Sequence, residues 1–353
     1  MMELMDLLKT AVEMKASDVF AVAGAPATAK IHGELKTLNG DKLLPPDTLR
    51  LISGTYDLAK RLMDRLMETG DDDFSVTIPG LARFRVNAYR QRGSFAMVIR
   101  VVAFDIPVAD NIGIPEDIIE LANVKAGMVL ITGTAGSGKS TTQACILDRI
   151  NKTRPCHIIT LEDPIEYLHR DIKSIVSQRE IAIDTADCAA ALKACLRQAP
   201  DVILVGEMRD PDTISAAMTA AETGHMLMAT LHTKGAVNTV DRIIDSFPPS
   251  QQQQIRIQLS MVLDTVVSQR LIPSVDGGQI PAFEIMHNTG AIRSLIRDSK
   301  THQIDNAIST GAAQGMISMD GYIYNLYKEG KITQQTAVDY ANDAEMMRRK
   351  IGR

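Results

Sequence analysis

The hydrophobic positions of the first hundred residues change their spacing from one segment to the next. Apolar residues in 3–15 recur every three to four positions, as on one face of a helix. Segments 73–78, 82–89 and 94–102 instead alternate between apolar and polar residues, as half-buried strands do. The same reading predicts two more short strands and two more helices, at residues 19–23, 29–32, 47–53 and 56–68. A small α+β domain is therefore predicted over residues 1–104.

The pattern is different beyond residue 116. Short runs that are apolar throughout alternate with helical stretches, and these runs lie at residues 128–132, 157–161, 202–205 and 226–230. Such runs, separated by helices, are typical of a parallel sheet that is covered on both faces. After Pro248 and Pro249 the pattern predicts mostly helices to the end of the chain. We therefore expect an α/β domain over residues 116–353, with a helical C-terminal part, joined to the first domain by a linker at 105–115.

The net charge and the low aromatic content argue against one class of binding partner, nucleic acid. The 38 basic and 43 acidic side chains give a net charge of −5, and the chain has no tryptophan and only 4% aromatic residues. A nucleic-acid-binding protein usually has a basic surface and aromatic stacking groups, so nucleic acid is not expected as the main partner. No segment resembles a signal peptide or a transmembrane helix.

The cysteines do not indicate a zinc site or a disulfide framework, because none of them forms a Cys-x-x-Cys pair. Buried free thiols are expected, and a cytoplasmic location fits them. The four cysteines are Cys145, Cys156, Cys188 and Cys195.

One segment matches the phosphate-binding pattern G-x-x-x-x-G-K-[ST], between a predicted strand and a predicted helix. It consists of Gly133, Thr134, Ala135, Gly136, Ser137, Gly138, Lys139 and Ser140, and is followed by Thr141. Glycines allow the backbone to turn tightly and to direct N–H groups at phosphate oxygens, and the helix N-terminus adds its positive dipole end. In this pattern Lys139 contacts the terminal phosphates and the Ser140 hydroxyl binds Mg²⁺, so the loop predicts a site for a nucleoside triphosphate with Mg²⁺.

Acidic residues follow two neighbouring predicted strands. The run 157–161 leads to Glu162, Asp163 and Glu166, and the run 202–205 leads to Gly206 and Glu207. Phosphoryl transfer to water requires Mg²⁺ at the phosphates and a group that orients or deprotonates the water. Glu207 is expected to hold Mg²⁺, and Glu166 is the better candidate for the water. His232, at the end of the run 226–230, is expected near the last phosphate, although a lone histidine is often an ordinary loop residue.

Several segments, in order, resemble the secretion ATPase superfamily and, within it, the PilT-like type IV pilus retraction ATPases. They are GTAGSGKSTT, ITLEDPIEYLH, DVILVGEMRD and AETGHMLMATLHTKG, which correspond to the Walker A, Asp, Walker B and His boxes of that family. ARFRVNA, at 82–88, and AIRSLIRD, at 291–298, also match family segments, the latter being associated with retraction. Phe20 departs from the family's early ASDLHL signature, in which a histidine usually stands at that position.

The resemblance implies a PAS-like N-terminal domain, a RecA-like ATPase domain and a homohexameric ring that binds ATP and Mg²⁺. It implies that Glu166 is the catalytic acid, that Glu207 is the Walker B acid, and that His225 and His232 form the His-box pair. It also implies that arginines of the N-terminal domain approach the phosphates, although these residues can equally be read as surface charge. They are Arg83, Arg85 and Arg100.

The function implied is that of a motor which hydrolyses ATP to retract type IV pili and so supports twitching motility. It would act at the cytoplasmic face of the inner membrane, on the pilus platform protein. The segment Arg197–Pro200 reads RQAP instead of the common REDP, which leaves a PilU-like accessory ATPase, working with a paralogue, as an alternative. A nucleotide-binding scaffold, a pilus extension or secretion ATPase and a DNA translocase are the remaining alternatives. No extra N-terminal domain or tetracysteine element is found, which argues against the extension class.

Overall fold

The computed structural model describes residues 3–31, 33–102 and 106–352. The chain divides into two compact units, the first formed by residues 1–105 and 166–168 and the second by 106–165 and 169–353. His32, and residues 104 and 105 at the predicted domain limit, lie outside the described residues. None of the described helices is both long enough and apolar enough to cross a bilayer.

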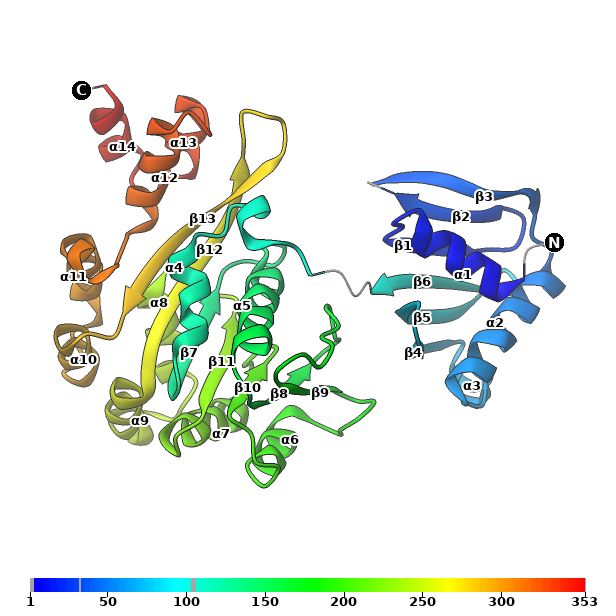
Figure 1. The fold of residues 1–353 in the computed structure, drawn as a ribbon, viewed down its shortest axis with the longest axis horizontal. Coiled ribbons are helices and arrows are strands. Elements are labelled where there is room, and N and C mark those ends of the chain that lie inside the picture. The colour runs from blue at the N-terminus through cyan, green and yellow to red at the C-terminus, as the bar shows by residue number, and fades with distance from the viewer. Residues whose placement is uncertain (1–2, 32, 103–105, 353) are drawn as a thin grey trace. The chain divides into compact units, whose positions relative to one another are not determined.

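The first unit is a six-stranded antiparallel sheet with helices on one face (Figure 1). The order of its strands is β3-β2-β1-β6-β5-β4. Its strands are β1 (Asp18–Ala21), β2 (Pro26–Ile31), β3 (Glu34–Lys42), β4 (Asp71–Ile78), β5 (Ala82–Gln91) and β6 (Ser94–Val102). Its helices are α1 (Leu4–Glu13), α2 (Pro45–Ala59) and α3 (Asp64–Thr69). The predicted α+β character of this region is confirmed.

The alternation along β5 explains why only one face of this sheet is covered. Phe84, Val86 and Ala88 are buried and join the core under the helices, while the residues between them point to the open face. The predicted helix break near Gly54 is wrong. A Cβ at Gly54 would lie 3.0 Å from Leu4 Cδ2, so the glycine permits the close approach of α1 to α2 rather than ending the helix.

A buried carboxylate links α2 to β4. Asp72 is 1% exposed, accepts a hydrogen bond from the Tyr56 hydroxyl at 2.9 Å and lies 3.3 Å from Arg61. The Tyr56 ring packs on Phe74 with a centroid distance of 4.5 Å. Burial and the neighbouring carboxylate raise the pKa of Tyr56 above its usual range, so the hydroxyl remains a donor.

The second unit is built on a seven-stranded sheet whose order is β13-β12-β7-β11-β10-β8-β9 (Figure 1). Its strands are β7 (Gly127–Thr132), β8 (His157–Glu162), β9 (Ile175–Glu180), β10 (Val202–Val205), β11 (Met226–Leu231), β12 (Leu263–Pro273) and β13 (Gln279–His287). All neighbours are parallel except β12 and β13. The mainly parallel sheet predicted for this region is confirmed.

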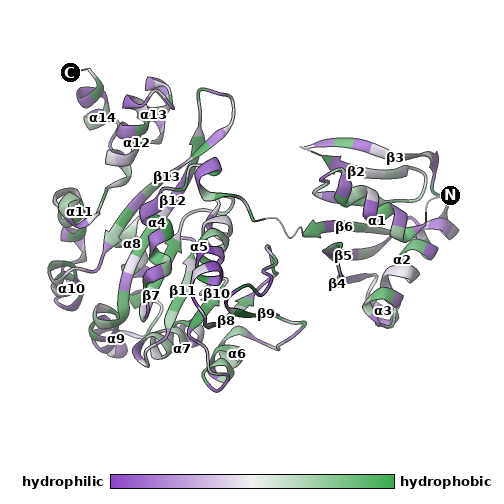
Figure 2. Cartoon of the chain, viewed as in Figure 1, coloured by the Kyte–Doolittle hydropathy of each residue, from purple (hydrophilic) through white to green (hydrophobic). Residues whose placement is uncertain are grey.

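Helices cover both faces of this sheet. Met128 and Leu130 of β7 join the core beneath α6 to α9, whereas Val129 and Ile131 join the opposite core beneath α4 and α5. The central strands are accordingly mostly hydrophobic along their length, as their green colour in Figure 2 shows, and five consecutive residues of β7 are buried. The helices are α4 (Glu116–Ile119), α5 (Lys139–Thr153), α6 (Cys188–Cys195), α7 (Pro211–Glu222), α8 (Ala236–Asp245), α9 (Pro249–Val262), α10 (Gly290–Arg297), α11 (Ile304–Thr310), α12 (Met319–Lys328), α13 (Gln334–Tyr340) and α14 (Ala344–Ile351).

The prediction of mostly helix after Pro249 is wrong for two long strands. β12 and β13 form an antiparallel pair, and β12 also lies parallel to β7. Most residues of β12 are buried, but its sequence LDTVVSQRLIP mixes polar and apolar residues and shows neither a continuous apolar run nor a regular alternation, so its periodicity does not identify a strand. The helices α12 to α14 pack on the far part of this hairpin through a separate core, which includes Ile272, Ala282 and Met347.

Replacing Tyr56 with Phe is expected to lower the free energy of unfolding of the first unit by about 1–2 kcal/mol, because Asp72 loses a buried donor. Urea denaturation of the full chain measures this change. Tyr89→Phe is the matched control, since the hydroxyl of Tyr89 has no partner among the described residues and its removal leaves stability near the wild-type value. Equal stability of the two variants would show that the Tyr56 hydroxyl does not support the fold.

Candidate functional site

The glycine-rich loop joins β7 to α5 at the carboxyl edge of the sheet. Gly133 has φ +146° and Gly138 has φ +87°, which L side chains rarely adopt. A Cβ at Gly133 would lie only 2.3 Å from the carbonyl oxygen of Gln269 on β12. Helix α5 then begins at Lys139 without a side-chain cap on its first N–H groups. These donors face the loop and are suited to an anion.

Lys139 is held at the mouth of this loop. Its side chain is 8% exposed, and its Nζ donates hydrogen bonds to the carbonyl oxygens of Gly133 and Thr134, each at 3.0 Å. The same ammonium group lies 3.3 Å from Nδ1 of His232, which follows β11. A buried ammonium fixed in this way presents positive charge to whatever enters the loop.

His232 connects Lys139 to an acidic residue on the next strand. Its Nε2 lies 3.2 Å from Oε1 of Glu207, which follows β10. The tautomer with the proton on Nε2 satisfies both contacts, since Nδ1 then accepts from Lys139 and Nε2 donates to Glu207. Arg209 donates to the other carboxylate oxygen, with Nε and Nη2 both at 2.8 Å. The structure thus brings Lys139, His232 and Glu207 together.

The strand that carries Glu207 is fixed by its neighbours. The Gly206 N–H donates to the Leu161 carbonyl oxygen at 2.7 Å, and the Gly206 carbonyl oxygen accepts from the Thr230 hydroxyl at 2.5 Å. A Cβ at Gly206 would lie 3.3 Å from Glu162 Cα and from the Leu161 carbonyl oxygen. This close approach favours a glycine at position 206.

Of two buried residues at the loop, one escaped the sequence reasoning and the other was predicted. Gln269 is 2% exposed, and its side-chain oxygen accepts a hydrogen bond from Thr142 of α5 at 2.7 Å. Its segment was expected to be helical, so nothing in the sequence placed it beside the loop. Ser137, which the motif does include, is 3% exposed and its hydroxyl has no partner among the described residues. An unsatisfied hydroxyl at this depth indicates that a ligand completes the loop.

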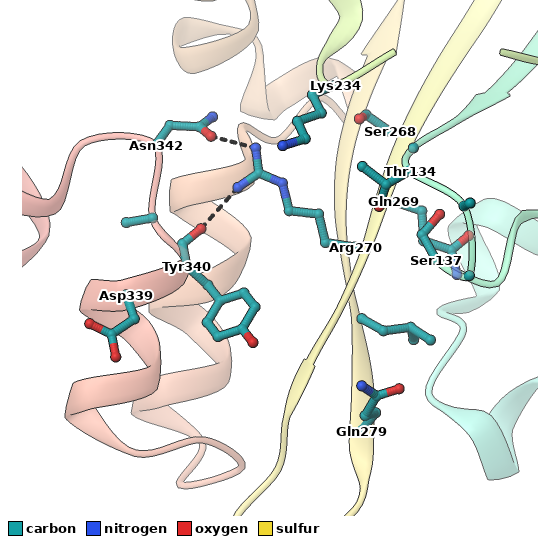
Figure 3. A pocket seen from close by; sticks show the side chains of 15 residues that line it. Thr134, Ser137, Lys234, Ser268, Gln269, Arg270, Gln279, Asp339, Tyr340 and Asn342 are labelled. Atoms are coloured by element: carbon teal, nitrogen blue, oxygen red, sulfur yellow. Dashed lines mark hydrogen bonds between the residues drawn. The ribbon is translucent and has the colours of Figure 1, made fainter. Parts of the chain in front are cut away.

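A cavity of about 610 Å³ opens beside the loop, on the side of β12 (Figure 3). Loop residues 133–137 form one wall, and the segment 339–342, which comprises the end of α13 and the two residues after it, forms another. Arg270 of β12 donates to the Tyr340 carbonyl oxygen at 2.9 Å and to the Asn342 side-chain oxygen at 2.5 Å. The volume is that of an ordinary small-molecule site. No sequence pattern pointed to Arg270, Tyr340 or Asn342.

Of the remaining predicted residues, His225 lies at the opposite end of its strand from this cluster. His225 precedes β11, and its Nδ1 lies 2.9 Å from the Ala220 carbonyl oxygen. Since His232 follows the same strand, the two histidines are about 20 Å apart at 3.3 Å per residue. Glu166 is exposed, beyond the end of β8, and its side chain makes no hydrogen bond or ion pair among the described residues. The roles expected for His225 and Glu166 therefore remain predictions.

The predicted arginines share the open face of the first unit. Arg83 and Arg85 are two residues apart on β5, and Arg85 pairs in register with Arg100 on β6. Arg83 donates to the Thr77 hydroxyl at 3.2 Å. Arg85 pairs with Asp73, and Arg100 donates to Asp18 at 3.1 Å. The open face thus gathers the three guanidinium groups, and their contact with phosphate remains a prediction.

The described residues contain no group of three or more His, Cys, Asp or Glu side chains arranged to hold a metal ion. All four cysteines are free, and burial raises the pKa of Cys145 and of Cys188 to about 11. The thiols of Cys145 and Cys188 are therefore protonated at neutral pH and are poor metal ligands. A divalent cation at this site would have to be bound jointly by the protein and a phosphate ligand, as is usual for Mg²⁺.

Comparison with known proteins gives a consistent result over nearly the whole chain. Residues 3–289 match the family model described as type II/IV secretion system protein. The type IV pilus retraction ATPase PilT of Pseudomonas aeruginosa is 40% identical over 349 residues, covering 98% of this chain and 99% of that protein. The PilU ATPase of the same organism is 37% identical over 351 residues, covering 99% and 91%.

The solved structures agree with these relatives. A crystal structure of the pilus retraction motor PilT with bound ADP superposes with a TM-score of 0.90 at 43% identity, covering 99% of this chain and 100% of that one. The likeness thus extends over both units.

Replacing Gly133 with Ala is expected to lower the melting temperature of the second unit clearly more than replacing Gly136, in the absence of any ligand. Both residues have positive φ, but a Cβ at Gly133 meets the Gln269 carbonyl oxygen, whereas one at Gly136 meets nothing within 4 Å. Gly136→Ala therefore carries only the left-handed backbone strain of about 1–2 kcal/mol. Thermal unfolding of the two variants measures the difference, and equal losses would show that the contact with Gln269 is not tight.

Proposed function

Because the chain belongs to the type II/IV secretion system protein family, we propose that it is a motor ATPase that retracts type IV pili. The observation that carries the proposal is the series of contacts from Lys139 through His232 to Glu207 at the mouth of the phosphate-binding loop. The similarity to PilT, over nearly the full length of both chains, supports retraction as the work that this ATPase performs.

The loop binds the phosphates of ATP in this proposal, and Ser140 and Glu207 hold Mg²⁺. The residues fit such an ion, because the Ser140 hydroxyl at the start of α5 and the Glu207 carboxylate after β10 both lie at the carboxyl edge of the sheet. The buried Ser137 hydroxyl has no partner among the described residues and can bind a ligand oxygen. Both oxygens of Glu207 already accept from Arg209 or contact His232, which favours binding of the ion through water. When bound, Mg²⁺ would neutralise the negative charge that develops on the phosphates during hydrolysis.

Each residue of the cluster has a distinct role in hydrolysis. Lys139 stabilises the negative charge on the terminal phosphates. His232 senses the last phosphate through its contact with Lys139, and it holds Glu207 in place. Glu166 orients and deprotonates the attacking water, for which its exposed carboxylate is free to move. His225 takes no part in this chemistry within one chain, because it lies at the other end of β11.

Motion follows from closure of the first unit on bound ATP. Arg83, Arg85 and Arg100 contact the phosphates in the closed state, exchanging their present carboxylate and hydroxyl partners for stronger phosphate contacts. Hydrolysis and release reopen the unit. In a ring of six chains, closing in sequence turns the central pore against the pilus platform protein at the cytoplasmic face of the inner membrane.

The similarity to PilU favours a second candidate. At 37% identity over 99% of this chain, PilU is nearly as similar as PilT, so an accessory retraction ATPase that assists a paralogue remains a specific alternative. The two candidates differ in whether the chain retracts pili when it is the only such ATPase in the cell.

Lys139→Ala is expected to reduce ATP hydrolysis by at least about a hundredfold, because the buried ammonium at the phosphates is lost. Phosphate release from the purified full chain, with ATP and Mg²⁺, measures the rate. Lys152→Ala is the matched control: this lysine lies on the same helix but is exposed and pairs with Asp148, so its removal leaves the rate near wild type. Equal rates for both variants would refute the proposed site.

Glu207→Ala is expected to bind ATP with near wild-type affinity but to hydrolyse it at least about a hundredfold more slowly, since the loop is intact while the metal-side acid is missing. ATP retained by the variant after gel filtration, compared with product formed in the same time, separates the two steps. Turnover at the wild-type rate would exclude Glu207 from the reaction.

Deletion of the gene in a host that carries type IV pili tests the direction of the work. Cells with many pili but without surface motility are expected, because assembly continues while retraction stops. Loss of pili would instead assign the chain to extension. Restoration of motility by this chain alone, in a host lacking every related retraction ATPase, would exclude the accessory role.

A further inference from the structure

Three buried polar side chains form a row across neighbouring strands of the second unit. Thr132 of β7 pairs in register with Ser268 of β12, and Ser268 pairs in register with Glu284 of β13. Residues that stand opposite each other in this way share one face of the sheet. Helix α8 covers that face, since the Thr239 hydroxyl lies 3.5 Å from the Thr132 hydroxyl. Glu284 is only 4% exposed, and burial of a carboxylate is costly unless hydrogen bonds compensate it.

The partners of this row lie in the turn between His232 and α8. The Gly235 N–H donates to the Ser268 hydroxyl at 2.9 Å, and the Ala236 N–H donates to Oε1 of Glu284 at 2.8 Å. Gly235 has φ +86°, and a Cβ there would lie 3.5 Å from the same carboxylate oxygen. The turn therefore lies directly against the two buried side chains.

His232 depends on this turn for its position. Its side chain is 46% exposed, so packing against neighbours fixes the ring only weakly. Its contacts with Lys139 and Glu207, at 3.3 and 3.2 Å, are long for hydrogen bonds. The backbone on either side of the residue must therefore place the ring. Strand β11 holds one side, and the turn holds the other.

We propose that Glu284 and Ser268 are positioning residues for hydrolysis. By holding the turn after His232, they keep its imidazole between Lys139 and Glu207. The inference rests on the proposed function, and it extends the site to two side chains that have no role in the reaction as described above.

The second oxygen of Glu284 explains why a carboxylate stands at this position. Oε2 accepts a hydrogen bond from the N–H of Met319, the first residue of α12, at 3.4 Å, while Oε1 serves Ala236, the first residue of α8. An ionised carboxylate presents acceptors only, whereas an amide would turn a donor toward one of the two N–H groups. Its negative charge also suits two helix N-termini. One side chain thus anchors both the turn after His232 and the start of α12.

The test separates the catalytic rate from stability. Glu284→Met keeps the length of the side chain but removes both acceptors. We expect it to lower kcat for ATP about tenfold while KM changes by less than about twofold, because Lys139 and the loop still bind the phosphates. Glu284→Gln keeps one acceptor oxygen and should lie between wild type and Glu284→Met. Ser268→Ala removes the acceptor for Gly235 alone and should lower kcat in the same way.

A second background shows whether the loss passes through the histidine. In chains that carry His232→Ala, Glu284→Met is expected to change kcat by less than about twofold, because no imidazole is left to misplace. Thr265→Val is the matched control, since it removes a buried hydroxyl of β12 whose partners are Asp264 and His287. It should lower the melting temperature while kcat stays near wild type.

Two results would overturn the inference while leaving the proposed function in place. They are a wild-type kcat in Glu284→Met, and an equal loss of kcat with and without His232. If Glu284→Met does not fold, Ser268→Ala decides by the same two comparisons. A wild-type chain that releases no phosphate from ATP with Mg²⁺ would instead overturn the proposed function, and the inference with it.

Discussion

A buried ammonium group at the mouth of a glycine-rich loop is the constraint around which the second unit is arranged. Lys139 needs acceptors because burial of an isolated charge is costly, and the loop carbonyl groups and His232 supply them. His232 can reach Lys139 only because β11 lies parallel to β7 and ends at the same edge of the sheet. Glu207 joins from β10 for the same reason. The parallel sheet, with helices on both faces, is thus the part of the fold that makes the site possible.

Much of this arrangement could be predicted from the sequence, because it depends on order along the chain. The apolar runs that became β7, β8, β10 and β11 were predicted to within one residue, since strands buried on both faces form short apolar runs, and helical stretches separate these runs along the chain. Parallel strands bring their carboxyl ends together, so Lys139, Glu207 and His232 were expected at one edge. The same order along the chain predicts that His225 lies at the opposite edge, although the family resemblance grouped it with His232.

The β12 strand, the cavity wall and the continuous helix α2 could not be predicted. Each depends on contacts between segments that are distant in the sequence and whose local patterns are ambiguous. The sequence of β12 fits a buried helix as well as a strand, and this ambiguity concealed Gln269 and Arg270 beside the loop. Tyr340 and Asn342 lie about seventy residues beyond Arg270, and an arginine, a tyrosine and an asparagine at such a distance form no motif. The helix through Gly54 was missed for a similar reason, since only the packing of α1 on α2 shows why the glycine is there.

Because the chain has no tryptophan, a tryptophan introduced at Tyr340 would be a specific fluorescence probe. A Tyr340→Trp chain would contain a single indole, located at the wall of the cavity beside the loop. Its emission would carry no background from other tryptophans, and the ring would keep its aromatic character in the wall. Because the chain has no other tryptophan, the emission of this one residue would report changes at the wall of the cavity beside the phosphate-binding loop.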